Sequence, residues 1–562
     1  MVAAMEPSES GRFGRRFWSE RFYAVMLILS SILLLGGAGG FLYLESNSPL
    51  SLLGGSDRPI AAATLFIPSQ SSFSISLLVQ PDKLVAFLQS LEGAEQWQQN
   101  VQEVEQFKQR FLDKTGLDYE QTIQPWLGDE VTFARAVADL DVDLSNGQQP
   151  GYLVAAEIAP GRQHQAKEFL QLFWQQQALY GNVPTTEKIS GVRILSATSA
   201  SSSPIKATAL IGDQFVLLAN DVRVLKRSIQ VAQTAENLAQ NLLYRETVAA
   251  LPEKRIGLAY FDPNLLNAFS ANKSFAAMSI GLAKTGLVVD ALLSSALQPP
   301  YTRVDKPIVA DELIQTSDAL ALLPATSDIV IADHDLSRLK SDLAIVGLST
   351  ETLPALLKSA LQLEIEPTAD TSWSWATGDY ALGKINTGRS QDWALVVERD
   401  DEGIAALDQY AIASGYSKVP VSIGDVTATA WTRFIAPEKS TFKNGQRSSS
   451  ELKTELLGLH LQQQRHEVFT DSLSAVDSVL STSEPLVQSA RFQQALGPLR
   501  LTPDKGYLYL DWPAVEPALR RRFPVLNQAA AITAPAFSHI DTVAATRENK
   551  AISFFVHLKE PS

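Results

Sequence analysis

The 562-residue sequence contains no cysteine. No disulfide can form, and a lipid anchor attached through cysteine is excluded. The stability of the folded region must therefore come from burial of apolar side chains. A chain of this length can supply a core of the necessary size. With 45% hydrophobic and 19% charged residues, the composition is that of a globular protein.

Positive charge is also scarce, since 47 Lys and Arg stand against 61 Asp and Glu. The first 21 residues contain four Arg and three Glu, which leaves 43 basic and 58 acidic side chains in the rest of the chain, a net charge of −15. An acidic surface repels phosphate backbones, so we expect no nucleic-acid partner. It also disfavours a protein that lies flat on an anionic membrane.

Familiar catalytic motifs are missing. The sequence has no Gly-x-Ser-x-Gly, no P-loop and no Gly-x-Gly-x-x-Gly. Ser270-Ala271-Asn272-Lys273 with Lys284-Thr285-Gly286 resembles part of the serine β-lactamase set, but the two lie 11 residues apart and no Ser-Asp-Asn occurs. We therefore expect no catalytic residue and no cofactor.

The six histidines do not form a recognisable metal site, and no HExxH occurs. In a strand, Asp333 and Asp335 would share one face while His334 points to the other, so these three ligands would not converge. His460 and His466 flank a predicted hairpin turn and could approach each other. Zinc would need two further ligands, so we expect no metal site.

Phe22–Leu44 is a run of 23 residues without a charge. As a helix it would reach roughly 34 Å, enough to cross a bilayer. Arginines precede the run, whereas the first positive charge after it is Arg58. The positive-inside rule predicts a single-pass signal anchor with a cytoplasmic N-terminus. The bulk of the chain would then be extracytoplasmic, in the periplasm or the thylakoid lumen.

Two features of this run leave alternatives open. Gly36 and Gly40 form a GxxxG pattern, a possible helix–helix contact that would allow a homo-oligomer. Gly37-Ala38-Gly39 supplies small residues for a signal-peptidase site, although the run is longer than a usual signal peptide core.

The sequence repeats itself. Trp126-Leu127-Gly128-Asp129 resembles Trp375-Ala376-Thr377-Gly378-Asp379, and Gly257–Asp262 resembles Gly506–Asp511. Trp126 and Trp375 are 249 residues apart, as are the two glycines that open the second pair. The shared offset predicts a tandem duplication. We interpret the repeated residues as structural landmarks: Trp126, Gly128, Asp129, Trp375, Gly378, Asp379, Tyr260, Asp262, Tyr509 and Asp511.

The expected fold class is α+β, with antiparallel sheets and amphipathic helices, because alternating strands and hairpin turns outnumber βαβ-like units. Phe275–Leu297 and Phe537–Lys559 are predicted to be β-hairpins that end the two repeats. The expected organisation is a cytoplasmic N-terminus (1–21), a transmembrane helix (22–44), a linker (45–60), and extracytoplasmic modules at 61–300 and 301–562.

With these landmarks and the apolar run, the chain resembles a cyanobacterial family of uncharacterised, single-pass membrane-anchored proteins that carry a domain of unknown function. The resemblance implies a location at the plasma membrane or the thylakoid, and no activity.

From these observations we expect a membrane-tethered, non-enzymatic binding or scaffold protein. Its partners would be proteins at the outer or lumenal face, and its role the assembly or maintenance of envelope or thylakoid complexes. Two alternatives stay open: an extracytoplasmic hydrolase with a carboxylate-based site, and a carrier for a lipid or pigment. A site with convergent acidic or histidine side chains in just one half would favour the hydrolase.

Overall fold

The computed structural model describes the chain from residue 49 onward, with gaps. The predicted membrane segment Phe22–Leu44, including Gly36 and Gly40, lies outside the described residues. Among the helices in the described ranges, none combines the length and apolar character needed to cross a bilayer. The described residues are 49–56, 58, 60–84, 118–141, 149–179, 181–197, 205–261, 276–293, 318–336, 339, 378–387, 390–435, 453–481, 484–499, 506–522, 540–548 and 551–559.

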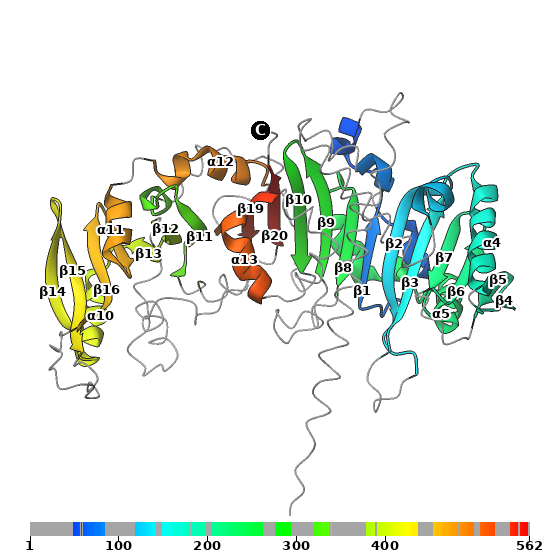
Figure 1. The fold of residues 1–562 in the computed structure, drawn as a ribbon, viewed down its shortest axis with the longest axis horizontal. Coiled ribbons are helices and arrows are strands. Elements are labelled where there is room, and N and C mark those ends of the chain that lie inside the picture. Colours follow the sequence, from blue (N-terminus) through cyan, green and yellow to red (C-terminus); the bar gives the residue numbers. More distant parts are fainter. Residues whose placement is uncertain are drawn as a thin grey trace, which may run out of the picture.

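Twenty strands form one antiparallel sheet, flanked by helices, so the chain is α+β as expected. Figure 1 shows the sheet running along the long axis of an elongated molecule. The pairings place the strands in the order β4-β5-β6-β7-β3-β2-β1-β8-β9-β10-β20-β19-β18-β11-β12-β13-β17-β16-β15-β14.

We call the strands before residue 300 the first half and the later strands the second half. The first half comprises β1 (Phe73–Leu77), β2 (Leu127–Val137), β3 (Gly151–Ile158), β4 (Thr185–Ile189), β5 (Val192–Ser196), β6 (Ala207–Ile211), β7 (Phe215–Ala219), β8 (Gly257–Phe261), β9 (Ala276–Ala283) and β10 (Gly286–Leu293). The second half comprises β11 (Ser327–Asp333), β12 (Tyr380–Asn386), β13 (Gln391–Glu398), β14 (Ser417–Ile423), β15 (Val426–Ile435), β16 (Lys453–Gln463), β17 (His466–Thr470), β18 (Tyr507–Asp511), β19 (Ile540–Glu548) and β20 (Ala551–Leu558).

The two halves follow the same path. Counted outward from the centre, the first half runs β10-β9-β8-β1-β2-β3-β7-β6-β5-β4, and the second half repeats this order with each strand number raised by ten. Hydrogen bonds outside the strands repeat as well: the Leu238 N–H donates to the Ile67 carbonyl, and the Leu486 N–H donates to the Leu323 carbonyl.

The halves meet through β10 and β20, which pair antiparallel from Gly286–His557 to Leu292–Ala551. The hairpin turn before β10 precedes Gly286 and that before β20 precedes Ala551, so equivalent residues of these strands are 265 apart. Val289 pairs with Phe554, the residue 265 positions later. An approximate two-fold axis therefore passes between these two residues, and the sheet continues across it.

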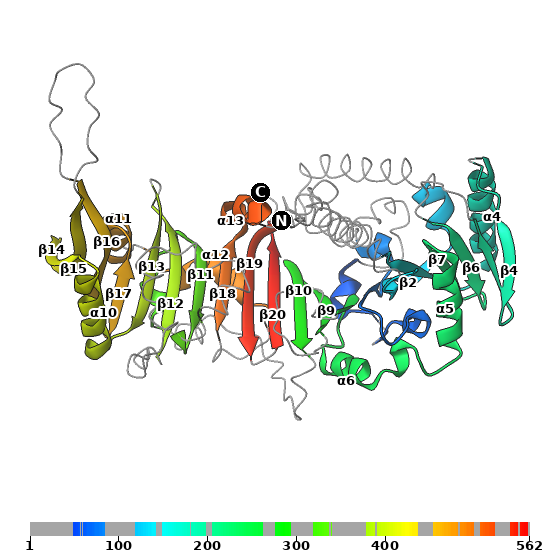
Figure 2. The same cartoon turned by 90° about the horizontal axis from the view of Figure 1, so that it is seen from below.

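Helices cover both faces of the sheet. The face that carries α5, α6, α11 and α12 is called the α12 face, and the face that carries α4, α10 and α13 is called the α10 face (Figure 2). The bounds are α4 (Gln163–Leu179), α5 (Val222–Ala232), α6 (Leu242–Ala250), α10 (Asp401–Ala413), α11 (Leu473–Leu480), α12 (Ala490–Leu496) and α13 (Trp512–Arg522).

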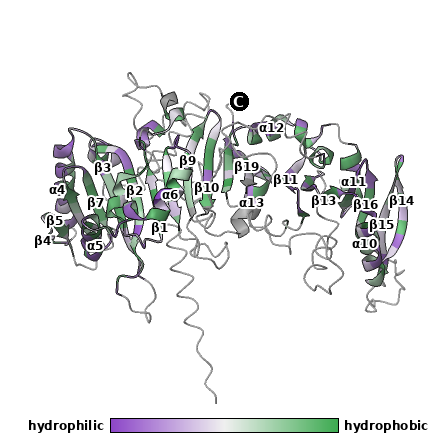
Figure 3. Cartoon of the chain, turned by 180° about the vertical axis from the view of Figure 1, so that it is seen from behind, coloured by the Kyte–Doolittle hydropathy of each residue, from purple (hydrophilic) through white to green (hydrophobic). Residues whose placement is uncertain are grey.

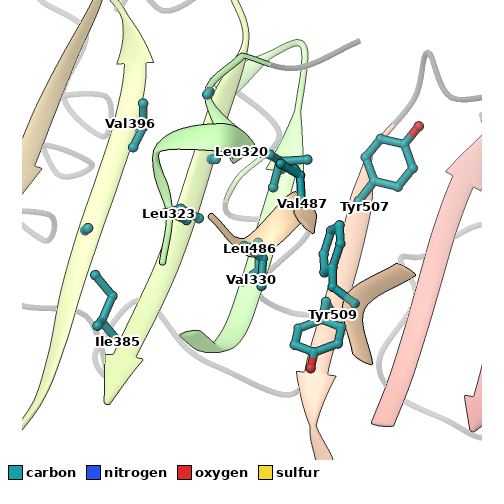
Figure 4. Close-up of a cluster of buried hydrophobic side chains, with 14 of the residues drawn as sticks. Leu320, Leu323, Val330, Ile385, Val396, Leu486, Val487, Tyr507 and Tyr509 are labelled. Atoms are coloured by element: carbon teal, nitrogen blue, oxygen red, sulfur yellow. The ribbon is translucent and has the colours of Figure 1, made fainter. Parts of the chain in front are cut away.

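Apolar cores fill the space between sheet and helices, and hydrophobic residues recur along the strands in Figure 3. In the second half, Leu320 and Leu323 of one short segment meet Leu486 and Val487 of another over β11, on the α12 face (Figure 4). On the same face, Val288 of β10 belongs to the second-half core. Burial therefore crosses the junction between the halves, which adds to the hydrogen bonds of β10 and β20.

Matching caps position the helices that follow β7 and β17. The Tyr152 N–H donates to Asn220 Oδ1 at 2.7 Å, and the Trp393 N–H donates to Asp471 Oδ1 at 2.9 Å. Asn220 and Asp471 therefore tie the helix entrance to the neighbouring strand. The N-cap itself is Asp221 in the first half and Ser472 in the second.

Both predicted terminal hairpins are confirmed, as β9–β10 and β19–β20. The strand Thr185–Ile189 was not predicted, because its side chains are mostly exposed and do not alternate between apolar and polar. Most of the Ser-rich stretch 196–203, and all of 439–450, lie outside the described residues.

Candidate functional site

A buried group of charged side chains lies between α10 and the sheet in the second half. Its centre is His460 on β16, which is 5% exposed. Nδ1 of His460 lies 2.6 Å from Oε1 of Glu467, and Nε2 lies 3.5 Å from Oδ1 of Asp408. We call His460, Glu467, Asp408 and their partners Arg399 and Lys418 the histidine network.

The helix α10 delivers Asp408 to this place. Asp400 caps the helix by accepting a hydrogen bond from the backbone N–H three residues later. Ile404, Leu407 and Ala411 are buried at helical spacing and pack toward the sheet. Asp408 follows Leu407 directly and is buried on the same side. An acidic residue thus occupies the apolar side of an amphipathic helix.

Aromatic rings hold His460 in place. The imidazole stacks on Trp431 with ring centroids 4.9 Å apart, and on Phe469 with centroids 5.6 Å apart. Trp431 also donates from Nε1 to Oδ1 of Asp408 at 2.8 Å. These contacts fix the orientation of both the histidine and the aspartate.

Two cations connect the buried carboxylates to solvent. Arg399 contacts Oε2 of Glu467 at 2.5 Å and Oδ1 of Asp401 at 2.7 Å. Lys418 donates from Nζ to Oδ2 of Asp408. The side chains of Arg399 and Lys418 are 31% and 47% exposed, against 2% and 10% for Glu467 and Asp408. Each buried carboxylate therefore has a cationic partner that reaches the surface.

The shifted pKa values agree with this arrangement. Burial raises the pKa of Asp408, but hydrogen bonds from Lys418 and Trp431 and the charge of His460 outweigh burial and lower it below its usual value. Burial lowers the pKa of Arg399, but the charge of Glu467 and the contact with Asp401 outweigh that effect and raise it. Both groups are held in their charged forms.

The geometry suits structural fixation better than group transfer. Nε2 of His460 makes no hydrogen bond within the part of the chain that the structure describes, so no hydroxyl is held there for activation. Glu467 is 1% exposed. The network instead joins α10, β13, β14, β16 and β17 through charge-assisted contacts.

The first half has an apolar and neutral pair in the corresponding helix and strand. Gly181 and Gly415, with φ of 83° and 85°, follow α4 and α10 as equivalent C-terminal residues. Trp174 lies seven residues before Gly181, as Asp408 lies seven before Gly415. The tryptophan of the first half therefore stands where the second half has its buried aspartate.

The strand position corresponds as well. Thr208 pairs with the fourth residue of β5, and His460 pairs with the fourth residue of β15. Trp174 donates from Nε1 to Oγ1 of Thr208 at 2.8 Å. In place of Glu467, the first half has the buried Val216, because each is the second residue of its strand. The same two elements are thus joined by one neutral hydrogen bond instead of five charged groups.

The predicted approach of His460 and His466 is wrong. His460 pairs with Phe469 and faces α10, whereas His466 pairs with Gln463 and faces the α12 face. Burial is the first cause that lowers the pKa of His466. Two histidines on opposite faces cannot share a ligand.

His334 does find a carboxylate partner. Its Nδ1 lies 2.5 Å from Oδ1 of Asp379, one of the repeated landmarks. The adjoining register sets Asp379 beside Glu398, whereas Glu130 holds the equivalent place beside Glu157. Within the described ranges, no group of three or more His, Asp or Glu residues is arranged to hold a metal ion.

Glu130 is fully buried in the first half and binds the segment that precedes the sheet. Its two carboxylate oxygens accept the Ala62 and Ala63 N–H groups, each at 2.7 Å. Burial raises its pKa, although these hydrogen bonds act in the opposite direction. This carboxylate is engaged in structure.

The landmarks around Trp126 serve packing. Trp126 is 2% exposed and stacks on Phe169 at 5.1 Å, and its Nε1 donates to a backbone carbonyl. A Cβ on Gly128 would lie 3.0 Å from the Glu157 side chain, and Gly378 has the same close approach to Glu398. These glycines leave room for a neighbouring glutamate.

The second pair of landmarks also packs in equivalent places. Tyr260 contacts Tyr244 edge-on at 5.5 Å, and Tyr509 contacts Phe492 at 5.2 Å. The remaining landmarks differ in their contacts. Asp129 lies 3.7 Å from Nζ of Lys83 and Asp511 lies 2.6 Å from Arg491, while Trp375 and Asp262 lie outside the described residues.

Sequence reasoning missed the histidine network, because its members are scattered over residues 399–467 without a motif. A usable signal was present in Asp408, a charge at a position where helical spacing predicts an apolar residue. Glu467 likewise follows the helix-facing side of a strand that otherwise reads as apolar.

Comparison with known proteins yields one match. No curated protein and no solved structure matches the chain. The model of a family described as "Protein of unknown function (DUF3352)" matches residues 27–554, nearly the whole sequence. The chain therefore belongs to the DUF3352 family.

Proposed function

We propose that this protein is a membrane-tethered, non-enzymatic binding or scaffold protein that holds protein partners at the extracytoplasmic face of a membrane. The observation that carries the proposal is the pairing of β10 with β20, which makes one continuous sheet out of two similar halves. Partners bound to the two halves would be held at a fixed separation, and linked sites raise effective concentration.

We also propose that the two halves arose by tandem duplication, with modules at 61–300 and 301–562. The shared order of strands supports this history, as does the 249-residue offset between Tyr260 and Tyr509, which pack against equivalent aromatic rings. A duplicated architecture suits binding surfaces, whereas an active site usually occurs once.

The membrane tether in this proposal is Phe22–Leu44, and its flanking charges place the bulk outside the cytoplasm. Periplasm or thylakoid lumen would be the compartment, and a cyanobacterial source agrees with either. Carbonate extraction of membranes tests the tether directly: retention in the pellet is expected, and release would contradict it.

The experiment for the scaffold role is a mild-detergent pull-down of the tagged full-length protein, with Gly286→Ala as the variant. A Cβ at Gly286 would lie 2.1 Å from the Val556 carbonyl oxygen, so the substitution pushes β10 away from β20. Gly54→Ala is the matched control, because nothing lies within 4 Å of a Cβ there. We expect a partner retained by wild type and Gly54→Ala and lost or weakened in Gly286→Ala.

A hydrolase is the second candidate, since convergent carboxylates and a histidine occur in only one half. The burial of His460 and Glu467 argues against it. If the purified protein turned over a substrate and His460→Gln abolished turnover without unfolding, the scaffold proposal would be overturned.

A further inference from the structure

We propose that the sheet stands on one edge against the membrane, with the turn Lys284-Thr285 toward the lipid surface; this rests on the proposed tether. The short helix η2 (Pro49–Gly54) packs at this edge, where Leu52 is buried beside Leu77 and Leu282. Leu282 lies two residues before the turn. The chain therefore reaches the folded region at the end of β9.

The distance available to the tether is short. The predicted span ends at Leu44, and the eight residues from there to Leu52 reach at most roughly 28 Å when fully extended. Further contacts hold the segment down: the Ser56 N–H donates to the Arg255 carbonyl at 2.7 Å, and Arg58 lies 2.7 Å from Glu157. The tether thus leads to a fixed point on the sheet.

The charge at this edge fits lipid phosphate. The Leu558 N–H donates to the Thr285 carbonyl at 2.9 Å, so Lys559 lies beside Lys284. Both lysines are exposed. They sit in a region whose net charge is −15, which disfavours contact through a whole face of the sheet. Contact through a lysine-bearing edge keeps most acidic groups away from the bilayer.

The opposite edge is far enough away for a clear measurement. Gln70 is exposed just before β1, and β1 begins at the edge opposite the turn because its last residue, Leu77, is the one beside η2. β9 and β10 are each 8 residues long, so the two edges are separated by about 27 Å along the strands.

The absence of cysteine allows a clean test with a single dye. Full-length Thr285→Cys and Gln70→Cys proteins would each carry one donor dye and be placed in vesicles of phosphatidylcholine with a minor share of phosphatidylglycerol. The headgroups carry the acceptor dye. We expect energy transfer to be several-fold more efficient from residue 285 than from residue 70, and Lys284→Gln with Lys559→Gln to reduce transfer from residue 285.

Equal transfer from the two positions would mean that the sheet lies flat, and stronger transfer from residue 70 would mean the reverse orientation. Either result overturns the proposal. Retention on carbonate-washed vesicles separates the causes: a protein that is retained but wrongly oriented refutes only the edge contact, while a released protein refutes the tether and the edge contact together.

Discussion

The two halves join the same helix to the same strand with different chemistry. In the first half, Trp174 of α4 donates one hydrogen bond to Thr208 amid apolar packing. In the second half, Asp408 of α10 meets His460, and three more charged groups complete the network. A shared backbone path therefore does not dictate what fills the space between helix and sheet.

The difference has an energetic meaning. Apolar burial tolerates small changes gradually, whereas a buried charged network depends on every member, since removing one partner leaves another buried charge uncompensated. The second half should therefore be the more sensitive of the two to single substitutions and to pH. Because the chain lacks disulfides, no covalent link offsets such a loss.

Glu467→Ala is expected to have the largest effect. It removes the partner of Arg399 and of His460, and breaking a buried pair typically costs about 3–5 kcal/mol. Val216→Ala is the matched substitution in the first half and should cost less, because it removes only apolar contacts. Amide exchange of α10 and α4 would measure both. A larger loss at Val216 would refute the contrast.

Asp408→Asn should come next, with a loss of about 2 kcal/mol at neutral pH, since hydrogen bonds to charged groups are worth about that much. The folded pKa of Asp408 is lowered, so its stabilisation is present above the unfolded value near 4 and is lost as the pH falls through the folded value. The wild type and the variant should converge on acidification. A difference that stays constant down to pH 2 would contradict this account.

Thr208→Val is expected to have a smaller effect in the first half. It leaves the buried Trp174 Nε1–H without its acceptor, which costs about 1.5 kcal/mol. Thr208→Ser keeps the acceptor and serves as the control. Protection of α4 in amide exchange should fall for valine and recover for serine; equal protection in both variants would show that the hydrogen bond contributes nothing.

Lys418→Ala should have the smallest effect. The lysine side chain is 47% exposed, and partly solvated ion pairs contribute less than about 1 kcal/mol. Thermal unfolding in low and in high salt measures it: the variant should lose little, and salt should shrink the gap. A loss as large as that of Glu467→Ala would show that the network has no graded order from core to surface.

The sequence allowed much of the fold to be predicted, because alternation and turn chemistry are local. The helix at 163–179 and the strands at 207–211 and 215–219 lie within a residue of their predicted positions. Equal offsets between landmarks also pointed to halves of the same order. The joining of β10 with β20 could not be predicted, because it pairs residues 265 or more positions apart through backbone groups that carry no sequence signal.

The histidine network was harder to predict than the fold. Its members come from five elements, and each one alone reads as an ordinary surface charge. Only the register brings His460 to the face of α10 and sends His466 to the other face. Burial and pairing, which decide their role, are properties of the assembled sheet.

The central claim is that the two halves are one rigid body, and a distance measurement tests it most directly. Spin labels at Glu246→Cys on α6 and Gln494→Cys on α12 lie on either side of the junction, at exposed positions of the same face. Pulsed electron paramagnetic resonance should give a single narrow distance that Gly286→Ala broadens, with Gly54→Ala unchanged. A broad distribution in the otherwise unaltered protein would contradict the continuous sheet.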